Sequence, residues 1–194
     1  MISLKPFHTF GLDSHARLVE TVTSVEQLSK FQGLKNNRDL IVLGSGSNSL
    51  FIKDYQGTIV LNRIMGKEVI ETAEHYVLKV GAGEDWHQFV DWCTGQGYWG
   101  LENLALIPGK VGACPIQNIG AYGLEAGKFI SKVEYFDLDS GQVSSLNNQQ
   151  CQFAYRQSIF KSELKYRAAI TSVEFRLPKN WSPILTYGEL KVLQ

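Results

Sequence analysis

The chain contains 194 residues, 44% of them hydrophobic and 20% charged, which is ordinary for a soluble globular protein of one large or two small domains. The 19 Lys and Arg residues balance 19 Asp and Glu residues, so bulk charge predicts neither a nucleic-acid partner nor binding to an anionic membrane. Three scattered cysteines and four histidines without ligand spacing predict neither a disulfide framework nor a metal site, and they fit a reducing cytoplasm. We expect no signal peptide and no membrane span, because no apolar run approaches the ~18–20 residues that cross a bilayer.

Residues 1–65 have the pattern of a small α/β lobe with strands and one helix. In chain order we expect an extended aromatic arm over residues 5–11, a helix from Ser24 to about Asn37, and buried strands over residues 40–43 and 58–62. The helix is predicted from Ser24 and Gln27, which have the spacing of a capping box. A turn near residues 65–67 separates this lobe from the next.

A loop rich in glycine and serine follows the first buried strand, and it comprises Gly44, Ser45, Gly46, Ser47, Asn48 and Ser49. Its backbone N–H groups and hydroxyls can form a cradle for a diphosphate, because oxyanions accept several hydrogen bonds at once. The loop is not a Rossmann fingerprint, because Ser49 stands where the third glycine would be, and it lacks the Gly-Lys-Ser/Thr of a P-loop. From this loop alone, a plain strand-to-helix turn is the favoured interpretation and the cradle is the alternative.

Residues 66–178 combine antiparallel strand patterns with short helices, which is typical of an α+β fold. In chain order we expect a strand over residues 76–81, a helix over 86–96 between the N-cap Asp85 and the stop Gly97, a hairpin of strands 133–137 and 142–146, a helical turn from Asn147 to Cys151, and a strand over 169–177 that Pro178 ends.

The stretch from Leu101 to Gly123 resembles neither a polar surface loop nor a regular core element. It holds four glycines and two prolines, and Lys110 is its only charge after Glu102. A buried, irregular wall of this kind has backbone N–H groups that need acceptors. A tightly packed loop and a bound ligand rich in oxygen and nitrogen acceptors explain it equally well.

Several segments resemble one known family, the UDP-N-acetylenolpyruvoylglucosamine reductases. The matching segments are Ile107-Pro108-Gly109, Val111-Gly112, the run from Pro115 to Gly123, Phe153-x-Tyr155-Arg156-x-Ser158-x-Phe160-Lys161 and Thr186-Tyr187-Gly188. His8 departs from the family pattern, which has Asn there. The resemblance implies a two-lobed FAD-binding domain of the vanillyl-alcohol-oxidase (PCMH) type, with an α/β lobe at residues 1–65 and an antiparallel α+β lobe at 66–178. Residues 179–194 would then begin the connection to a substrate-binding domain.

The resemblance also implies an activity. Members of this family use NADPH as hydride donor and tightly but non-covalently bound FAD to reduce the enolpyruvyl group of a UDP-sugar, which gives UDP-N-acetylmuramate for peptidoglycan. We accordingly expect a cytoplasmic monomer with a small-molecule partner. The family's proton-donor Ser and assisting Glu lie outside the matched region, so we expect these 194 residues to be a catalytically incomplete FAD-binding fragment.

The family's functional residues map onto the matching positions of this chain. Arg156 corresponds to a catalytic arginine that binds the substrate carboxylate, and Tyr155 and Tyr187 correspond to substrate-binding residues. The implied FAD-binding residues are those of the glycine–serine loop (Gly44, Ser45, Gly46, Ser47, Asn48, Ser49), those of the wall (Ile107, Pro108, Gly109, Gly112, Pro115, Ile116, Gln117, Asn118, Gly120, Ala121, Tyr122, Gly123), and Ile170.

Two other functions stay open at this point. One is a non-catalytic FAD-binding module, which would lack substrate-dependent NADPH oxidation. The other is a different flavin oxidase of the same domain superfamily, which a covalent flavin link through His or Cys would mark. Cys114 is the cysteine nearest to the segments that resemble the flavin site.

Overall fold

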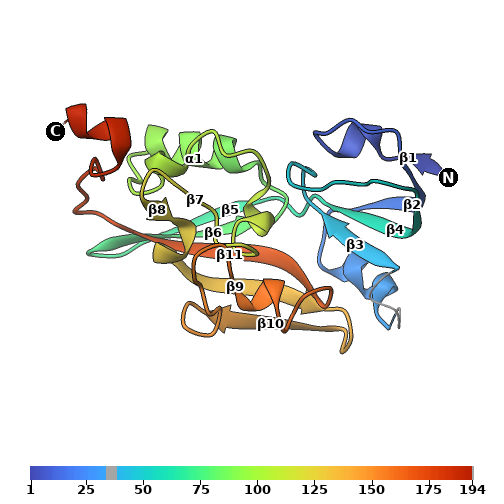
Figure 1. Ribbon diagram of the computed structural model, residues 1–194. Coiled ribbons are helices and arrows are strands. Elements are labelled where there is room, and N and C mark those ends of the chain that lie inside the picture. The colour runs from blue at the N-terminus through green and yellow to red at the C-terminus, as the bar shows by residue number, and fades with distance from the viewer. Residues whose placement is uncertain (34–38, 194) are drawn as a thin grey trace.

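The computed structural model describes residues 1–33 and 39–193, which form two large β-sheets set side by side and a small two-stranded sheet (Figure 1). The first sheet has the order β1-β2-β4-β3, with β1 antiparallel to β2 and with β2 and β3 both parallel to β4. Its strands are β1 Ile2–Ser3, β2 His15–Val22, β3 Leu40–Leu43 and β4 Tyr55–Asn62, and its 3-10 helices are η1 Lys5–Phe7 and η2 Glu26–Phe31. This is the small α/β lobe.

The second sheet is antiparallel throughout and has the order β10-β9-β11-β6-β5. Its strands are β5 Lys67–Glu71, β6 His75–Gly81, β9 Ile130–Asp137, β10 Gln142–Asn147 and β11 Ala168–Pro178. The other elements are α1 Trp86–Gly95, the short pair β7 Gly120–Ala121 and β8 Leu124–Glu125, and the 3-10 helices η3 Glu102–Leu104, η4 Val111–Ala113, η5 Ala126–Lys128, η6 Ile159–Lys161 and η7 Gly188–Leu193.

Helix α1 covers one face of the second sheet (Figure 1). Asp85 caps it by accepting a hydrogen bond from the backbone N–H of Gln88, as the sequence predicts. The helix buries Trp86 and Phe89, and their rings lie 5.9 and 5.1 Å from the ring of Phe175 in β11. Aromatic packing therefore fixes α1 on the sheet that carries the irregular wall.

The two sheets share an apolar cluster. Val60 and Ile64 from the first lobe lie in one buried cluster with Phe136 and Ala169 from the second. At the same seam the side-chain amide of Asn62 donates a hydrogen bond of 2.7 Å to the carbonyl of Ile170 in β11. The lobes are therefore one packed body, and the carboxyl ends of β3 and β4 lie beside β11.

Most predicted strands and the α+β class are confirmed, but the first lobe differs in detail. The helix predicted from Ser24 to about Asn37 is a 3-10 helix that ends at Phe31, and the side chain of Gln27 accepts from the N–H of Thr23. Gly33 is left-handed, with φ +69°, so the chain turns away from the helix there. The rest of the predicted helix falls outside the described residues.

The arm over residues 5–11 is not fully extended, because Lys5–Phe7 form η1. Strands β1, β2 and β5 were not predicted. Every residue of β5 is exposed, so this strand lacks the alternation of buried and exposed positions on which strand prediction depends. None of the described helices has the length and apolar character needed to cross a membrane.

Asp137, at the end of β9, connects the β9–β10 hairpin to the segment before β11 through its contact with Arg167. Its buried carboxylate accepts hydrogen bonds from the guanidinium of Arg167, the shortest being 2.6 Å, and from the backbone N–H groups of Asp139 and Ser140. These hydrogen bonds, the Arg167 contact foremost, hold the pKa of Asp137 below its ordinary value.

We expect Asp137→Asn to lower the free energy of unfolding by about 2 kcal/mol near neutral pH, since hydrogen bonds to charged groups contribute roughly 1.5–3 kcal/mol. Because the folded-state pKa is depressed, this stability is present above the unfolded pKa of about 3.9 and is lost as pH falls through the lower folded value. Urea unfolding at a series of pH values measures it. Asp91→Asn, at an exposed carboxylate on α1, is the control with little expected effect. A wild-type advantage that persists unchanged at acid pH would contradict the assignment.

Candidate functional site

The glycine–serine loop, residues 44–49, leaves β3 and lies against the irregular wall of the second lobe. The hydroxyl of Ser47 donates a hydrogen bond of 3.0 Å to the carbonyl of Pro108. The side-chain amide of Asn48 lies 3.5 Å from the amide oxygen of Gln117, and Arg63 donates to the carbonyl of Gly44 at 3.0 Å. The loop therefore spans the seam between the lobes, where the carboxyl ends of two parallel strands meet it.

Position 46 of this loop accepts only glycine. Its φ is +63°, and a Cβ at this position would lie 2.0 Å from the carbonyl oxygen of Phe7. Among the described residues, no protein acceptor takes the backbone N–H groups of Ser47 and Asn48. The loop thus has the free donors that an anion cradle requires, and the residues present fit a diphosphate.

Three neighbouring pockets run from the seam across the wall. The inter-lobe pocket, of about 70 Å³, is lined by Val42, Gly44, Asn62, Ala82, Lys110, Gly112, Ala113, Ile116, Ala168 and Ile170. The central pocket, of about 490 Å³, is lined by Ser47, Asn48, Trp86, Ile107, Pro108, Gly109, Lys110, Ala113, Cys114, Gln117, Ile119, Gly120 and Arg156. The outer pocket, of about 540 Å³, is lined by Asn118, Gly120, Ala121, Tyr122, Gly123, Leu124, Glu125, Lys128, Tyr155, Arg156 and Tyr187.

Shared residues join these pockets into one path. Lys110 and Ala113 border both the inter-lobe and the central pocket, and Gly120 and Arg156 border both the central and the outer pocket. An elongated ligand can therefore lie along the path with one end at the seam. Such a shape suits a dinucleotide better than it suits a compact ligand.

Most of the sequence-predicted FAD residues line this path, and four do not. Ser45, Gly46, Ser49 and Pro115 border none of the three pockets. Gly46 and Pro115 are buried, so they act on the shape of the loop and the wall. Ile170, predicted as an isolated strand residue, is 4% exposed and lines the inter-lobe pocket.

Asn118 holds the wall in shape through its side chain. It is 2% exposed and adopts a left-handed backbone with φ +47°. Its amide donates to the carboxylate of Glu125 at 2.8 Å and to the carbonyl of Ala154, and its oxygen accepts from the N–H of Gly127 at 2.7 Å. Because these polar atoms are engaged with protein, Asn118 positions the backbone around the outer pocket.

Arg156 stands where the central and outer pockets meet. Its guanidinium donates a hydrogen bond of 3.1 Å to the carbonyl of Gly120, and Lys161 donates to the Arg156 carbonyl at 3.0 Å. The buried hydroxyl of Ser158 donates to the carbonyl of Ile116 at 2.6 Å, which ties this segment to the wall. Arg156 has φ +53°, a strained conformation that these contacts maintain.

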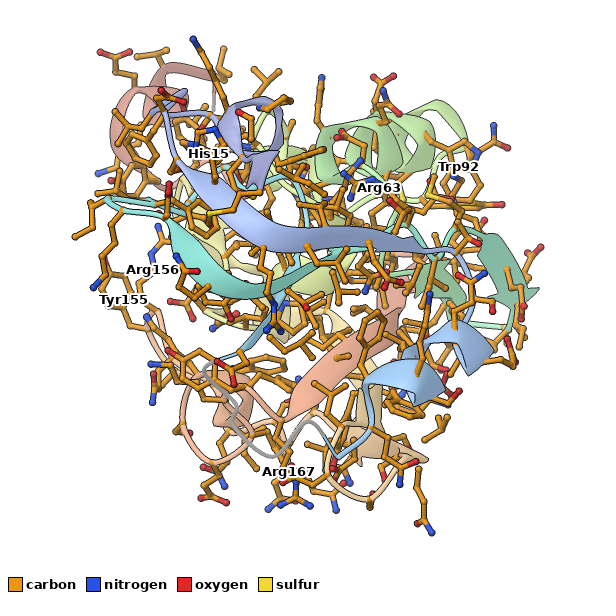
Figure 2. The ribbon with its side chains drawn as sticks, turned by 90° about the vertical axis from the view of Figure 1, so that its right-hand side faces the viewer. His15, Arg63, Trp92, Tyr155, Arg156 and Arg167 are labelled. Atoms are coloured by element: carbon orange, nitrogen blue, oxygen red, sulfur yellow. The ribbon has the colours of Figure 1, made fainter. Side chains whose placement is uncertain are left out.

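The two predicted substrate tyrosines lie at the outer pocket. Tyr155 is 81% exposed and lies next to Arg156 at the outer pocket (Figure 2). Tyr187 is also exposed and meets the ring of Tyr122 edge-on at 6.2 Å. The structure therefore brings Tyr187 to the same pocket as the adjacent residues Tyr155 and Arg156.

Sequence reasoning missed several residues of the path, most notably Lys110 and Lys128. Lys110 had one signal, its place as a single charge in an otherwise uncharged wall. Cys114 also lines the central pocket, but burial raises the pKa of its thiol well above the ordinary value. A protonated thiol is a poor nucleophile, so the pocket does not favour a covalent flavin link through Cys114.

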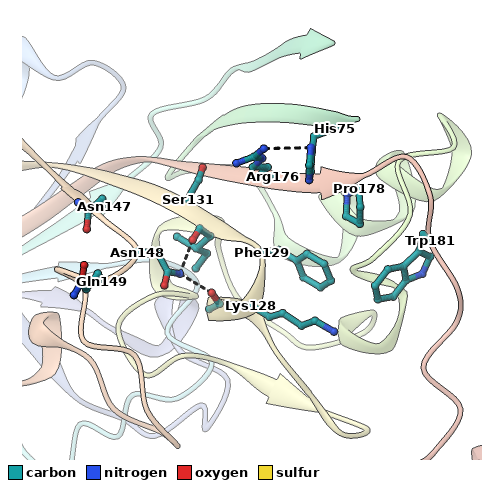
Figure 3. A pocket seen from close by; sticks show the side chains of 12 residues that line it. His75, Lys128, Phe129, Ser131, Asn147, Asn148, Gln149, Arg176, Pro178 and Trp181 are labelled. Atoms are coloured by element: carbon teal, nitrogen blue, oxygen red, sulfur yellow. Dashed lines mark hydrogen bonds between the residues drawn. The ribbon is translucent and has the colours of Figure 1, made fainter. Parts of the chain in front are cut away.

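A larger pocket, of about 800 Å³, lies elsewhere, where several strands of the second sheet begin or end (Figure 3). None of the predicted site residues lines it. Its polar groups are largely engaged with the protein: Asn148 donates to the carbonyls of Gly127 and Ile130, and the ammonium of Lys128 lies 5.4 Å from the ring of Trp181. We therefore place the candidate site at the seam, in spite of this pocket's size. The described residues contain no cluster of His, Cys, Asp or Glu that could hold a metal ion.

The sequence model of the FAD binding domain family matches residues 16–147, and the chain belongs to this family. Within it, the chain is similar to UDP-N-acetylenolpyruvoylglucosamine reductases, with 46% identity to that of Aliivibrio fischeri over 99% of this chain and 51% identity to that of Photobacterium profundum over 98%. The chain spans 56% of the length of each of these curated relatives. The resemblance inferred from the motifs is therefore confirmed.

Solved structures agree on the fold. The reductase from Thermus caldophilus matches with a TM-score of 0.74 and 25% identity, covering 94% of this chain and 62% of that chain. A glucooligosaccharide oxidase from Acremonium strictum matches with a TM-score of 0.57 and 12% identity, covering 90% of this chain and 36% of that chain. The oxidase likeness concerns the fold alone, and together the two structures confirm the two-lobed FAD-binding architecture.

Gly46→Ala is expected to displace the loop from Phe7 and to weaken FAD binding at least about tenfold, because a Cβ cannot occupy that position and a left-handed backbone is unfavourable for alanine. Flavin fluorescence titration measures the affinity, and thermal unfolding checks the fold. Gly95→Ala is the matched control, since its Cβ would meet nothing within 4 Å. Equal FAD affinity in the two variants would rule out the cradle.

Proposed function

We propose that this chain is the FAD-binding portion of a UDP-N-acetylenolpyruvoylglucosamine reductase, which uses NADPH to convert its enolpyruvyl substrate to UDP-N-acetylmuramate. The observation that supports this most is the position of Arg156, a cation at the junction of two pockets that can hold a flavin ring and a substrate. Because the chain spans 56% of the length of its relatives, the complete reaction is assigned to the longer protein.

The residues along the path fit the successive parts of FAD. The free N–H groups of Ser47 and Asn48 would hold the diphosphate, and Ile170 at the inter-lobe pocket would face the adenosine half. The backbone from Ile107 to Gly109 and that around Gly120 would enclose the ring. When bound, FAD would accept a hydride from NADPH and pass it to the enolpyruvyl carbon.

Arg156 supplies the charge that this reduction requires. As hydride reaches an enol ether beside a carboxylate, negative charge builds up on the carboxylate. A guanidinium binds a carboxylate through two parallel hydrogen bonds and stays charged at any working pH. The hydrogen bond to the Gly120 carbonyl orients Arg156 before the substrate arrives, and a preorganised donor of this kind typically lowers the barrier by a few kcal/mol.

The rest of the outer pocket would bind the sugar nucleotide. The exposed rings of Tyr155 and Tyr187 offer aromatic faces and hydroxyl groups, and the lining of this pocket includes Lys128 as well as Arg156. These features suit an anionic ligand with hydroxyl-rich sugars. They leave the central pocket to the cofactor, so that substrate and flavin would meet at Arg156.

The visible absorption spectrum of the purified chain, with identification of the nucleotide that heat releases, tests the cofactor assignment. We expect a flavin spectrum and released FAD, and uptake of added FAD by any apoprotein. A folded, cooperatively unfolding protein that binds no FAD would overturn the proposed function. We also expect the 194 residues alone to show no substrate-dependent NADPH oxidation.

Within the complete reductase, Arg156→Met is expected to slow substrate-dependent reoxidation of the flavin by about 100-fold or more, because a donor at developing charge is lost. Flavin reduction by NADPH should stay within about twofold of wild type, because that step does not involve the substrate carboxylate. Stopped-flow absorbance separates the two steps. Lys165→Met removes a charge from the same segment outside the pockets and is the control. Unchanged reoxidation in Arg156→Met would refute the assigned role.

A further inference from the structure

Lys110 occupies the point where the inter-lobe and central pockets meet. Its Cβ and Cγ lie 3.2 Å from the place that a Cβ on Gly44 would take, so its stem packs directly on the glycine–serine loop. It is the one charged residue among those that line the inter-lobe pocket. The loop contributes Gly44 to this pocket and Ser47 and Asn48 to the central one, so Lys110 shares both pockets with residues of the loop.

The ammonium of Lys110 has an ionic neighbour but no hydrogen-bond acceptor among the described residues. The Lys110 side chain is 18% exposed, and its Nζ lies 3.6 Å from Oδ2 of Asp85. The other oxygen of Asp85 is engaged as the helix cap, where it accepts from the N–H of Gln88. An ammonium carries three N–H donors, and the Asp85 carboxylate at 3.6 Å is an ion-pair partner beyond ordinary hydrogen-bond length, so these donors can turn to a ligand in the pocket. The arrangement is suited to an anionic acceptor that enters the pocket.

We propose that Lys110 is the counter-cation of the FAD diphosphate and that Asp85 is the anion with which it pairs until the diphosphate enters the pocket. This proposal rests on the proposed function and adds a residue to it. The loop N–H groups of Ser47 and Asn48 bring hydrogen bonds without a full charge, and a diphosphate carries negative charges that those dipoles compensate only in part. Lys110 supplies the missing positive charge at short range.

A purely structural ion pair between Lys110 and Asp85 is the alternative. In that case the pair serves only to fix the start of α1 beside the wall, and its loss would lower stability without a preference for phosphate. Asp85 allows the two roles to be separated, because Asn is also a good N-cap. Asp85→Asn therefore keeps the cap and removes the charge that competes for Lys110.

The experiment measures FAD and riboflavin affinities of the wild-type chain and its variants by fluorescence titration over a series of NaCl concentrations. Lys110→Met is expected to weaken FAD binding about tenfold or more and to reduce its salt dependence, with riboflavin, which has no phosphate, within about twofold of wild type. Lys110→Arg should recover FAD affinity to within about threefold, since the charge returns. Asp85→Asn should leave FAD binding equal to wild type or tighter.

Lys30→Met is the matched control, because Lys30 pairs with Glu20 on the first lobe and lines none of the three pockets. The proposal is overturned if Lys110→Met binds FAD as wild type does, if Lys110→Arg is as weak as Lys110→Met, or if FAD and riboflavin lose affinity equally. Absence of FAD binding in the wild type would instead refute the proposed function itself, so the two failures are distinct.

Discussion

The seam between the two sheets is the constraint on which the site depends. Each lobe alone offers half of the path. The first lobe contributes the loop with free N–H groups at the end of β3, and the second contributes the irregular wall that packs against β6 and β11. The hydrogen bond from Asn62 to Ile170 and the apolar cluster around Val60 and Phe136 set the distance between these halves. Because packed interiors deform little, a change at the seam would move the loop relative to the wall as a rigid unit.

The wall keeps its shape with little regular secondary structure. Buried polar side chains take over the task that strands and helices perform elsewhere: Asn118 organises the turn to Gly127, and Ser158 ties the Arg156 segment to Ile116. Hydrogen bonds of this kind are strong in a low dielectric and costly to leave unmade, so they select one backbone path. The left-handed residues Asn118, Tyr122 and Arg156 show that this path is held against local preference.

Local sequence patterns predicted the structural features that residues close together in the chain determine. These include the strand at Leu40–Leu43, the Asp85 cap and the hairpin of β9 and β10. The helix predicted after Ser24 is a 3-10 helix that ends at Phe31, because the chain turns at Gly33 to meet the second lobe, and a capping signal carries no information on that contact. The need for glycine at position 46 arises from Phe7, and the setting of Lys110 arises from Asp85 in another element. Contacts between residues so far apart produce no periodic pattern in the sequence. The family motifs located the wall as a segment but did not predict these individual contacts.

The pairing of β11 with both β6 and β9 also bears on how the protein reaches this fold. Strands β2, β3 and β4 lie close together in the sequence, whereas Phe175 in β11 pairs with Leu78 in β6 across most of the second lobe. Contacts between distant residues form late because closing a long loop costs entropy. The wall, whose Gly112 is hydrogen-bonded to Ala82 at the end of β6, has no completed sheet to rest on until β11 arrives. On a ribosome, the strands of the first lobe would therefore emerge well before the sheet that supports the wall is complete, because β11 ends only at residue 178.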